Sequence, residues 1–316
     1  MTKSLTKDAL RKKLKPVCVN CSESTVTTYV HNIFRLYHLV HPEKDQIPSS
    51  STWLKAPALL KKYDSLKLSA RRVLSLAAIK AVQAYHGKDG KNEAWYKRMK
   101  DTMEEYETQR DKRMKTAREK DRWPKKGYDA LKTAAEKLKK EIKPLLSKVS
   151  SRSELYKLQQ YVVLKLYSEH ALRLDWADVK LRRPEKDQKW NYLYKDKRKG
   201  WILIVRKFKT AKFMGEQELK IARPAALALT NFVPKVTDWT DHGFLLSTKG
   251  GKKLSRTGLS LFLSRLTQKY VGKKLSAQLI RVLKATKYRA ETEKSAEIAR
   301  EMMHGGKQHE QYTKKN

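Results

Sequence analysis

The sequence has few cysteines and no long apolar run. Cysteine occurs at only two of the 316 positions, Cys18 and Cys21, which excludes a fold held together by several disulfides. A lone Cys-x-x-Cys can be half of a zinc site, but no second cysteine pair and no His-x-x-x-His completes it. No run of about 18 apolar residues occurs, which excludes a membrane-spanning helix. The basic N-terminal segment lacks the apolar centre of a signal peptide, so we expect an intracellular or virion-borne protein.

Acidic residues are scarce relative to basic ones. Lys and Arg number 72 against 33 Asp and Glu, a formal charge of +39, and the basic residues run from Lys3 to Lys315. Such an excess repels itself in a compact fold unless a polyanion neutralises it, and nucleic acid is the usual partner. Hydrophobic residues make up 40% of the chain, too many for a disordered basic tail. Composition alone leaves a ribosomal or chromatin-type packing protein open.

Helical spacing of apolar residues dominates the first part of the chain. Segments 22–39, 52–63 and 69–85 each carry an apolar face. Segment 92–122, a long charged stretch with sparse Met and aromatic residues, is predicted to be a mostly solvated or DNA-facing helix. The composition breaks at Trp123-Pro124 and the following Lys-Lys-Gly. We therefore predict a helical DNA-binding domain over 1–122, a linker over 123–127 and a second domain over 128–316.

In the second domain, apolar residues follow a helical spacing at both ends of the sequence and alternate with polar residues in the middle. Alternation over 190–194, 200–206 and 218–222 predicts a small three-stranded antiparallel sheet with lysines at its tip. Helices are expected at 128–146, 151–166, 224–232 and 257–270, around Arg281, and at 292–303. A polar helix after them would aim Tyr312. The predicted fold class is mainly α with a small antiparallel β-sheet, an α+β fold in two domains.

Several side chains of the second domain suit phosphoryl chemistry. Tyr312 is a candidate nucleophile, because a phenol with a pKa of roughly 10 needs cationic neighbours and an electrophile that gains charge, such as a phosphodiester among arginines. Arg173 and Arg281 have apolar neighbours, and each taken alone is better explained as an ordinary surface or packing residue. We expect Asp175 or Asp178 to hold the Arg173 guanidinium. A lysine at a hairpin tip can donate a proton to a leaving group or contact a phosphate.

The order of these residues resembles the catalytic domain of the tyrosine recombinases and integrases, relatives of type IB topoisomerases. ALRLDW resembles the first arginine box of the family, which carries over Arg173. QLIR resembles its His-x-x-Arg box, which gives Arg281, and MMHGG resembles its Leu-Gly-His box, which gives His304. RKFKTAK resembles the hairpin whose lysine precedes a threonine, which selects Lys209 over Lys207 and Lys212. The terminal QYTKKN supplies Tyr312.

This resemblance covers 128–316, and the preceding helices resemble the core-binding domain of the family. It implies a two-domain C-shaped clamp on double-stranded DNA, a homotetramer on DNA, no cofactor and no metal. The implied activity is site-specific strand cleavage and rejoining through a 3′-phosphotyrosine, by an enzyme of a virus or mobile element acting at DNA in a host nucleus, nucleoid or virus factory. A type IB topoisomerase, or a DNA-binding protein whose site has decayed, remains an alternative.

Two positions depart from the family pattern. Gln278 stands where the family usually has histidine or lysine, and an amide can donate a hydrogen bond but cannot exchange a proton near neutral pH. Met303 replaces the usual glycine before His304, which we interpret as a packing change. Because four residues follow Tyr312, we expect assembly contacts from elsewhere, such as the helix that carries this tyrosine.

Overall fold

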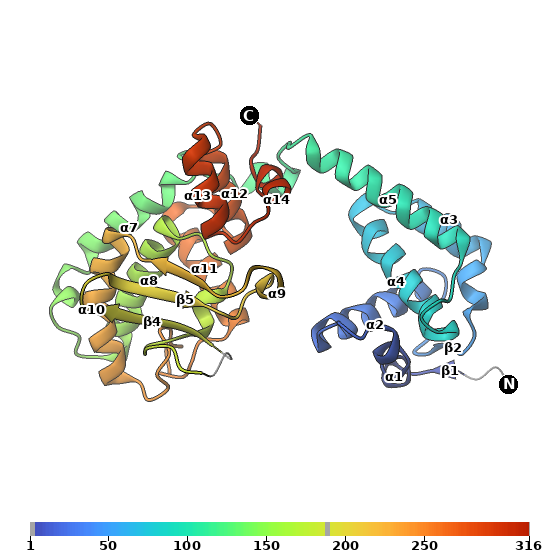
Figure 1. Cartoon of the computed structure of the whole chain (residues 1–316), viewed down its shortest axis with the longest axis horizontal. Coiled ribbons are helices and arrows are strands. Elements are labelled where there is room, and N and C mark those ends of the chain that lie inside the picture. Colours follow the sequence, from blue (N-terminus) through green and yellow to red (C-terminus); the bar gives the residue numbers. More distant parts are fainter. Residues whose placement is uncertain (1–3, 187–189, 316) are drawn as a thin grey trace. The chain divides into compact units, whose positions relative to one another are not determined.

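The computed structural model describes residues 4–186 and 190–315 and forms two compact units, residues 1–112 and 113–316 (Figure 1). This division precedes the predicted linker, so residues 113–127 belong to the second unit. Trp123 packs against the core of that unit, with Lys115 Nζ 4.5 Å from the centre of its ring. The tryptophan that marks a composition break is therefore partly buried against a packed core.

The first unit is a helical module with one small strand pair. Its helices are α1 (Lys7–Val17), α2 (Glu23–Tyr37), η1 (Ser51–Lys55), α3 (Pro57–Asp64), α4 (Leu68–His86) and α5 (Glu93–Asp111), and β1 (Ser4–Leu5) pairs antiparallel with β2 (Ile47–Pro48). Helix α1 was not predicted, because Leu10 and Leu14 are its only buried residues. A disulfide joins Cys18 to Cys21 in the turn before α2, a pairing the sequence did not predict.

The long charged segment of this unit is mostly solvated, as its composition indicates. Only Trp95 and Thr102 of α5 are buried. The indole of Trp95 donates a hydrogen bond to the carbonyl of Leu54 at 2.8 Å, and its ring lies edge-on to Tyr63 with centroids 4.9 Å apart. One large aromatic therefore anchors a helix whose other side chains are mainly charged.

The second unit surrounds the buried helix α8 (Arg152–Glu169) with the remaining helices. These are α6 (Ala117–Arg122), α7 (Asp129–Glu141), η2 (Lys143–Leu146), η3 (Asp175–Asp178), α9 (Ala211–Met214), α10 (Arg223–Trp239), α11 (Arg256–Val271), α12 (Ala277–Lys287), α13 (Thr292–Glu301) and α14 (Gly306–Tyr312). Helix α10 is longer than predicted and continues through Pro234. The single helix predicted over 92–122 is instead two helices, α5 and α6.

The sheet of this unit has four strands where the sequence predicted three. The strand order is β3 (Val179–Lys180), β4 (Asn191–Asp196), β5 (Gly200–Val205) and β6 (Gln217–Lys220), with β3 parallel to β4 and the other pairs antiparallel. The parallel strand was missed because two residues are too short to show a period.

Alternation along β5 places its side chains on two faces. Leu203 and Val205 join the main core, whereas Ile202 and Ile204 form a smaller cluster with Tyr192 on the other face. The predicted class, mainly α with a small antiparallel sheet in an α+β fold, is confirmed, and the structure adds one parallel pair, β3 with β4. None of the helices in the described part of the chain combines the length and apolar character needed to cross a bilayer.

Candidate active site

Three C-terminal helices bring four of the six predicted site residues into contact. Figure 1 shows α12, α13 and α14 gathered near the C-terminus. Ser276 caps α12 by accepting a hydrogen bond from the amide of Leu279, and Gln278 and Arg281 are three residues apart on this helix, so they share a face. The Gln278 amide donates to the Tyr312 hydroxyl at 2.6 Å, and the Tyr312 ring centre lies 5.4 Å from Arg281 Cζ.

Arg281 and His304 form a buried pair beside the tyrosine. The Arg281 side chain is 1% exposed, and its Nη2 donates to the Met302 carbonyl at 2.7 Å and to His304 Nε2. Because Nε2 accepts this bond, a neutral His304 carries its ring proton on Nδ1. The His304 and Tyr312 ring centroids are 4.2 Å apart. These contacts fix the rotations of all three side chains.

The same pair contains two nitrogens without hydrogen-bond partners. Arg281 Nε and His304 Nδ1 are buried, and neither has a partner among residues 4–186 and 190–315. A buried donor without an acceptor costs about 1–3 kcal/mol. The cluster therefore contains two unsatisfied donors that are enclosed by protein atoms, so an acceptor on a bound molecule reaches them only if the surrounding side chains rearrange.

Arg173 adds a second positive charge to the cluster. Its side chain is half-buried and has no ion pair or hydrogen bond with another described residue, while its carbonyl accepts a hydrogen bond from the Tyr167 hydroxyl at 2.7 Å. Burial first, and then the charge of Arg173, lowers the pKa of Arg281 to about 10. Two guanidinium groups close enough to repel each other form an environment that favours an anion between them.

The prediction that Asp175 or Asp178 holds Arg173 is wrong. Both carboxylates bind Arg256 instead, at 2.9 Å each, and Lys253 adds a contact to Asp178 at 3.2 Å. Since these acids have other partners, they leave the Arg173 guanidinium uncompensated. Sequence proximity suggested the neighbouring arginine, whereas the fold brings in one from α11.

Lys209 does not contact the cluster. It is exposed in the β5–β6 connection, and its ammonium has no ion pair or hydrogen bond with another described residue. Its neighbour Thr210 donates to the Met303 carbonyl at 3.5 Å, which joins this connection to the turn before His304. Lys207 is instead 3.8 Å from Asp178. Lys209 thus has the freedom of a mobile group next to the cluster.

Met303 is more than a packing change. Its side chain is 2% exposed, as a packing residue should be, but its φ is +54°. This left-handed conformation costs a non-glycine residue about 1 kcal/mol or more. Burial of the methionine side chain offsets that cost at a position where the backbone itself favours glycine.

A buried ion network that the sequence analysis missed joins α12 to α13. Lys284 donates to both carboxylate oxygens of Glu301, at 2.9 and 2.7 Å, and His170 Nδ1 lies 3.5 Å from the same carboxylate. Burial raises the pKa of Glu301, but His170 and Lys284 outweigh it and the net shift is downward. Lys284 follows Arg281 by one helical turn and Glu301 precedes His304 by three residues. The only sequence signal was this shared spacing.

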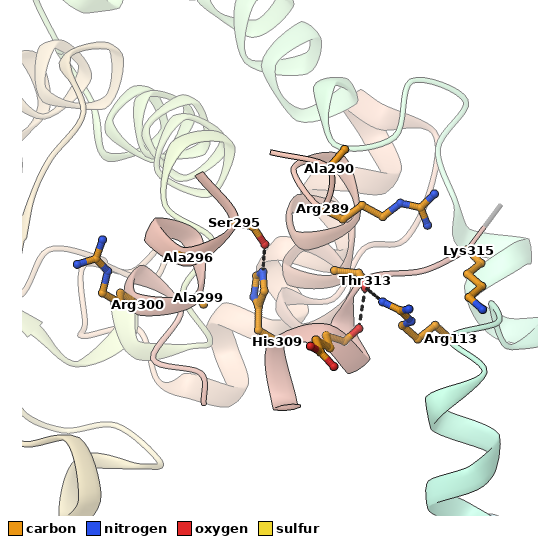
Figure 2. Close-up of a pocket in the computed structure, with 11 residues that line it drawn as sticks. Arg113, Arg289, Ala290, Ser295, Ala296, Ala299, Arg300, His309, Thr313 and Lys315 are labelled. Carbon is orange, nitrogen blue, oxygen red and sulfur yellow. Dashed lines mark hydrogen bonds between the residues drawn. The ribbon is translucent and has the colours of Figure 1, made fainter. Parts of the chain in front are cut away.

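The segment around Tyr312 also makes contacts on the side facing away from the Arg281–His304 cluster. A pocket of about 1030 Å³ lies beside α14. In it Ser295 hydrogen-bonds His309 at 2.9 Å, which joins α13 to α14 (Figure 2). Arg113 donates to Thr313 Oγ1 at 3.3 Å, and the Arg113 carbonyl accepts from the Lys315 amide at 3.0 Å. Side chains of the cluster do not line this pocket, whose contacts instead fix the middle and the C-terminal end of the tyrosine helix.

His304 should make the stability of the protein depend on pH. Burial, followed by the charges of Arg281 and Arg173, lowers its pKa from 6.5 to about 2. A histidine whose folded pKa is depressed stabilises the fold above the unfolded pKa, and this stability is lost as pH falls from 6.5 toward 2. We expect the free energy of unfolding to fall by about 2 kcal/mol from this residue between pH 7 and pH 5.

Urea titrations of the wild type and His304→Asn across this range provide the measurement. The asparagine does not titrate, so the variant should show a shallower pH slope. His309 and His242, whose pKa values burial also lowers, are present in both proteins and cancel in the difference. Equal slopes in the two proteins would contradict the assigned environment of His304.

Comparisons with known proteins give distant structural likenesses. No protein-family model and no curated protein matches the chain. A structure entitled "Crystal structure of XerA recombinase" is 13% identical, with a TM-score of 0.44 over 97% of this chain and 94% of that chain. A pre-cleavage complex of the XerH site-specific recombinase with its difH substrate is 12% identical, with a TM-score of 0.41 over 97% and 91%.

The described residues contain no group of three or more His, Cys, Asp or Glu side chains that could hold a metal ion. The polar groups that converge near Tyr312 are instead cations and neutral donors. Such an arrangement can bind a tetrahedral anion and stabilise negative charge that develops on it.

Proposed function

We propose that this protein cuts and rejoins double-stranded DNA, with Tyr312 as the nucleophile and a 3′-phosphotyrosine as the intermediate. The observation that carries the proposal is the buried cluster itself, in which Arg281 and His304 pack beside a tyrosine whose hydroxyl is 2.6 Å from Gln278. The half-buried, uncompensated Arg173 provides donors for a phosphodiester, and the two buried unpartnered nitrogens add to them once the cluster opens to the DNA backbone. The formal charge of +39 suits a DNA partner.

The proposed reaction exchanges one phosphate ester for another. The Tyr312 oxygen forms a bond to the scissile phosphorus, and the bond from phosphorus to the 5′ oxygen breaks. Arg173 and Arg281 hold the non-bridging oxygens, where planar donors match the growing charge, and His304 adds a hydrogen bond from Nδ1. Lys209 protonates the leaving 5′ oxygen. Attack by a 5′-hydroxyl on the phosphotyrosine reverses these steps and rejoins a strand.

Gln278 supports the tyrosine without acting as its base. Its amide nitrogen donates to the Tyr312 oxygen and so stabilises a phenolate, but an amide cannot accept the phenolic proton near neutral pH. In the proposed reaction that proton leaves to solvent. The departure from the family pattern at this position therefore removes a base and keeps a hydrogen bond.

Substitutions of Gln278 test this role. We expect Gln278→Ala to slow cleavage about tenfold, because one hydrogen bond to a charged oxygen is lost. Gln278→His should restore the rate and add a pH dependence near the pKa of histidine, since an imidazole can both donate and accept. Single-turnover cleavage of a nicked duplex from pH 5.5 to pH 8.5 measures both. An alanine variant as fast as the wild type would remove Gln278 from the reaction.

The experiment that tests the proposal uses a suicide duplex, nicked so that the strand released by cleavage diffuses away. The wild-type protein should accumulate a denaturant-stable adduct with the 3′ phosphate, and peptide mapping should locate it on Tyr312. Binding without an adduct on any duplex, including those enriched by binding from a random pool, would favour a DNA-binding protein instead.

We extend the proposal to site-specific recombination by four protomers around two duplexes, by an intracellular enzyme of a virus or mobile element. These finer statements rest on the family resemblance of the sequence motifs. Strand exchange between two duplexes is the expected product. Relaxation of supercoiled DNA by a monomer, without exchange, would replace recombination with a type IB topoisomerase activity.

A further inference from the structure

Helix α9, in the connection that carries Lys209, exposes a phenylalanine to solvent. Phe213 is 89% exposed, more than any other large hydrophobic side chain in the described part of the chain, where Val19 follows at 79%. An aromatic ring of this size has up to about 3 kcal/mol to gain from burial. A ring left in water beside a candidate active site is therefore available for a contact with a partner.

The backbone that presents Phe213 is anchored. Ala211 and Met214, on the opposite side of the same turn, pack against the main core, and Phe208 is 9% exposed. The Gly215 amide donates to the Ala211 carbonyl at 2.9 Å, and Thr210 reaches the Met303 carbonyl at 3.5 Å. The connection thus holds one phenylalanine in the core and directs the other outward.

The charges beside Phe213 indicate the chemistry of a partner that would bind there. Lys209 and Lys212 are both exposed, and neither has an ion pair with another described residue. A surface that satisfies two ammonium groups and an aromatic ring within one turn combines anionic groups with flat apolar faces. Duplex DNA has both, in its phosphates and in the faces of its bases.

The position of the turn relates this contact to the proposed reaction. A helix rises about 1.5 Å per residue, so Phe213 lies about 5 Å along the chain axis from Thr210, which touches the residue before His304. Successive phosphates of one strand advance about 3.4 Å along the duplex axis. Phe213 can therefore reach base steps within a few nucleotides of a phosphate bound by the cluster.

We propose that Phe213 inserts against a base step of the bound duplex next to the cleaved phosphate and partly unstacks it. This inference rests on the proposed function and assigns a new DNA contact to the connection. Unstacking a step costs a few kcal/mol and is easiest at flexible pyrimidine–purine steps. Phe213 would consequently favour cleavage next to such steps, a source of sequence preference that needs no hydrogen bond to a base.

The test places 2-aminopurine, which becomes brighter when it unstacks, at successive positions of a duplex enriched from a random pool by binding to the full chain. Binding is measured in a Tyr312→Phe background so that strand cleavage does not contribute. We expect fluorescence at one or two adjacent positions to rise severalfold, and the added change Phe213→Ala to abolish this rise and weaken binding about tenfold. Phe213→Trp should retain both.

Leu227→Ala is the matched control, because Leu227 is 59% exposed on α10 and has no role in the proposal. It should leave the fluorescence rise intact. Thermal melting checks that each variant folds. If Phe213→Ala unfolds, Phe213→Leu replaces it, and the rise in fluorescence should then be smaller at the same positions of the duplex.

The outcomes separate this inference from the proposed function. An adduct on Tyr312 with no fluorescence rise at any position, or with a rise that survives Phe213→Ala, would overturn the Phe213 contact alone. The absence of any adduct would overturn the proposed reaction. Self-association without DNA that Phe213→Ala abolishes, together with an unchanged fluorescence signal, would assign the ring to a contact between copies of the chain and overturn the DNA contact.

Discussion

Tyr312→Phe is expected to abolish the covalent protein–DNA adduct while leaving duplex binding within about threefold of the wild type. The change removes one oxygen, the atom that would bond to phosphorus, and leaves the ring that packs beside His304. Affinity should persist because it rests on phosphate contacts from basic residues spread along the chain. The measurement is denaturing electrophoresis of the suicide-duplex reaction, with a filter or fluorescence assay of binding.

This substitution is informative because it should hardly change stability. Within the described part of the chain, the hydrogen bond that the Tyr312 hydroxyl loses is the one from Gln278, whose side chain is exposed and can bond to water instead, a change of about 1 kcal/mol or less. The matched control is Tyr288→Phe, which removes the hydroxyl of another tyrosine of the same unit and should form adducts at the wild-type rate. Adducts that persist in Tyr312→Phe would refute the assigned nucleophile.

The two arginines are expected to respond differently to truncation. Arg173→Ala should slow cleavage by about 10²- to 10³-fold, the usual effect of removing one donor to a developing charge, with a melting temperature within about 2 °C of the wild type. Its guanidinium has no hydrogen bond or ion pair to lose with residues 4–186 and 190–315, and its removal relieves the repulsion that lowers the pKa of Arg281. Arg173→Ala should therefore slow cleavage without destabilising the fold.

Arg281→Ala should both slow cleavage and destabilise the fold. This side chain is 1% exposed, and its loss leaves a cavity and removes the donor to the Met302 carbonyl and His304. A cost of about 3 kcal/mol is expected from a buried group with these contacts, which corresponds to a fall of roughly 6–12 °C in melting temperature for a unit of this size. Calorimetry and single-turnover cleavage on both variants supply the comparison. A strongly destabilised Arg173→Ala, or a fully stable Arg281→Ala, would contradict the burial and contacts assigned to them.

Much of the fold could be predicted because its signals are local. Helices α2, α4, α8 and α12 carry apolar residues at helical spacing, and β4 and β5 alternate, so a window of ten to twenty residues contains the information. Helix α14 was expected from its position before Tyr312. By contrast, α1 buries only two leucines and β3 has two residues, and in both cases pairing with distant segments supplies the stability that the local pattern lacks.

The candidate site was likewise predictable only in part. Sequence motifs selected Arg173, Gln278, Arg281, His304 and Tyr312, because their order and residue types are visible along the chain. The sequence did not show which atoms of these side chains contact one another. The Gln278 amide reaches the hydroxyl of Tyr312 across 34 residues, and the order of the motifs says nothing of that contact.

The sequence by itself determined the residue types of the candidate site, the basic character of the chain and most of its helices. Only the tertiary structure decided that Asp175 and Asp178 bind Arg256 and leave Arg173 uncompensated, and that Lys284 and Glu301 fix α12 against α13. It also decided that Phe213 faces solvent while Phe208 is buried. The physical reason is that burial and charge pairing depend on distances between segments far apart in the chain, which local spacing does not encode.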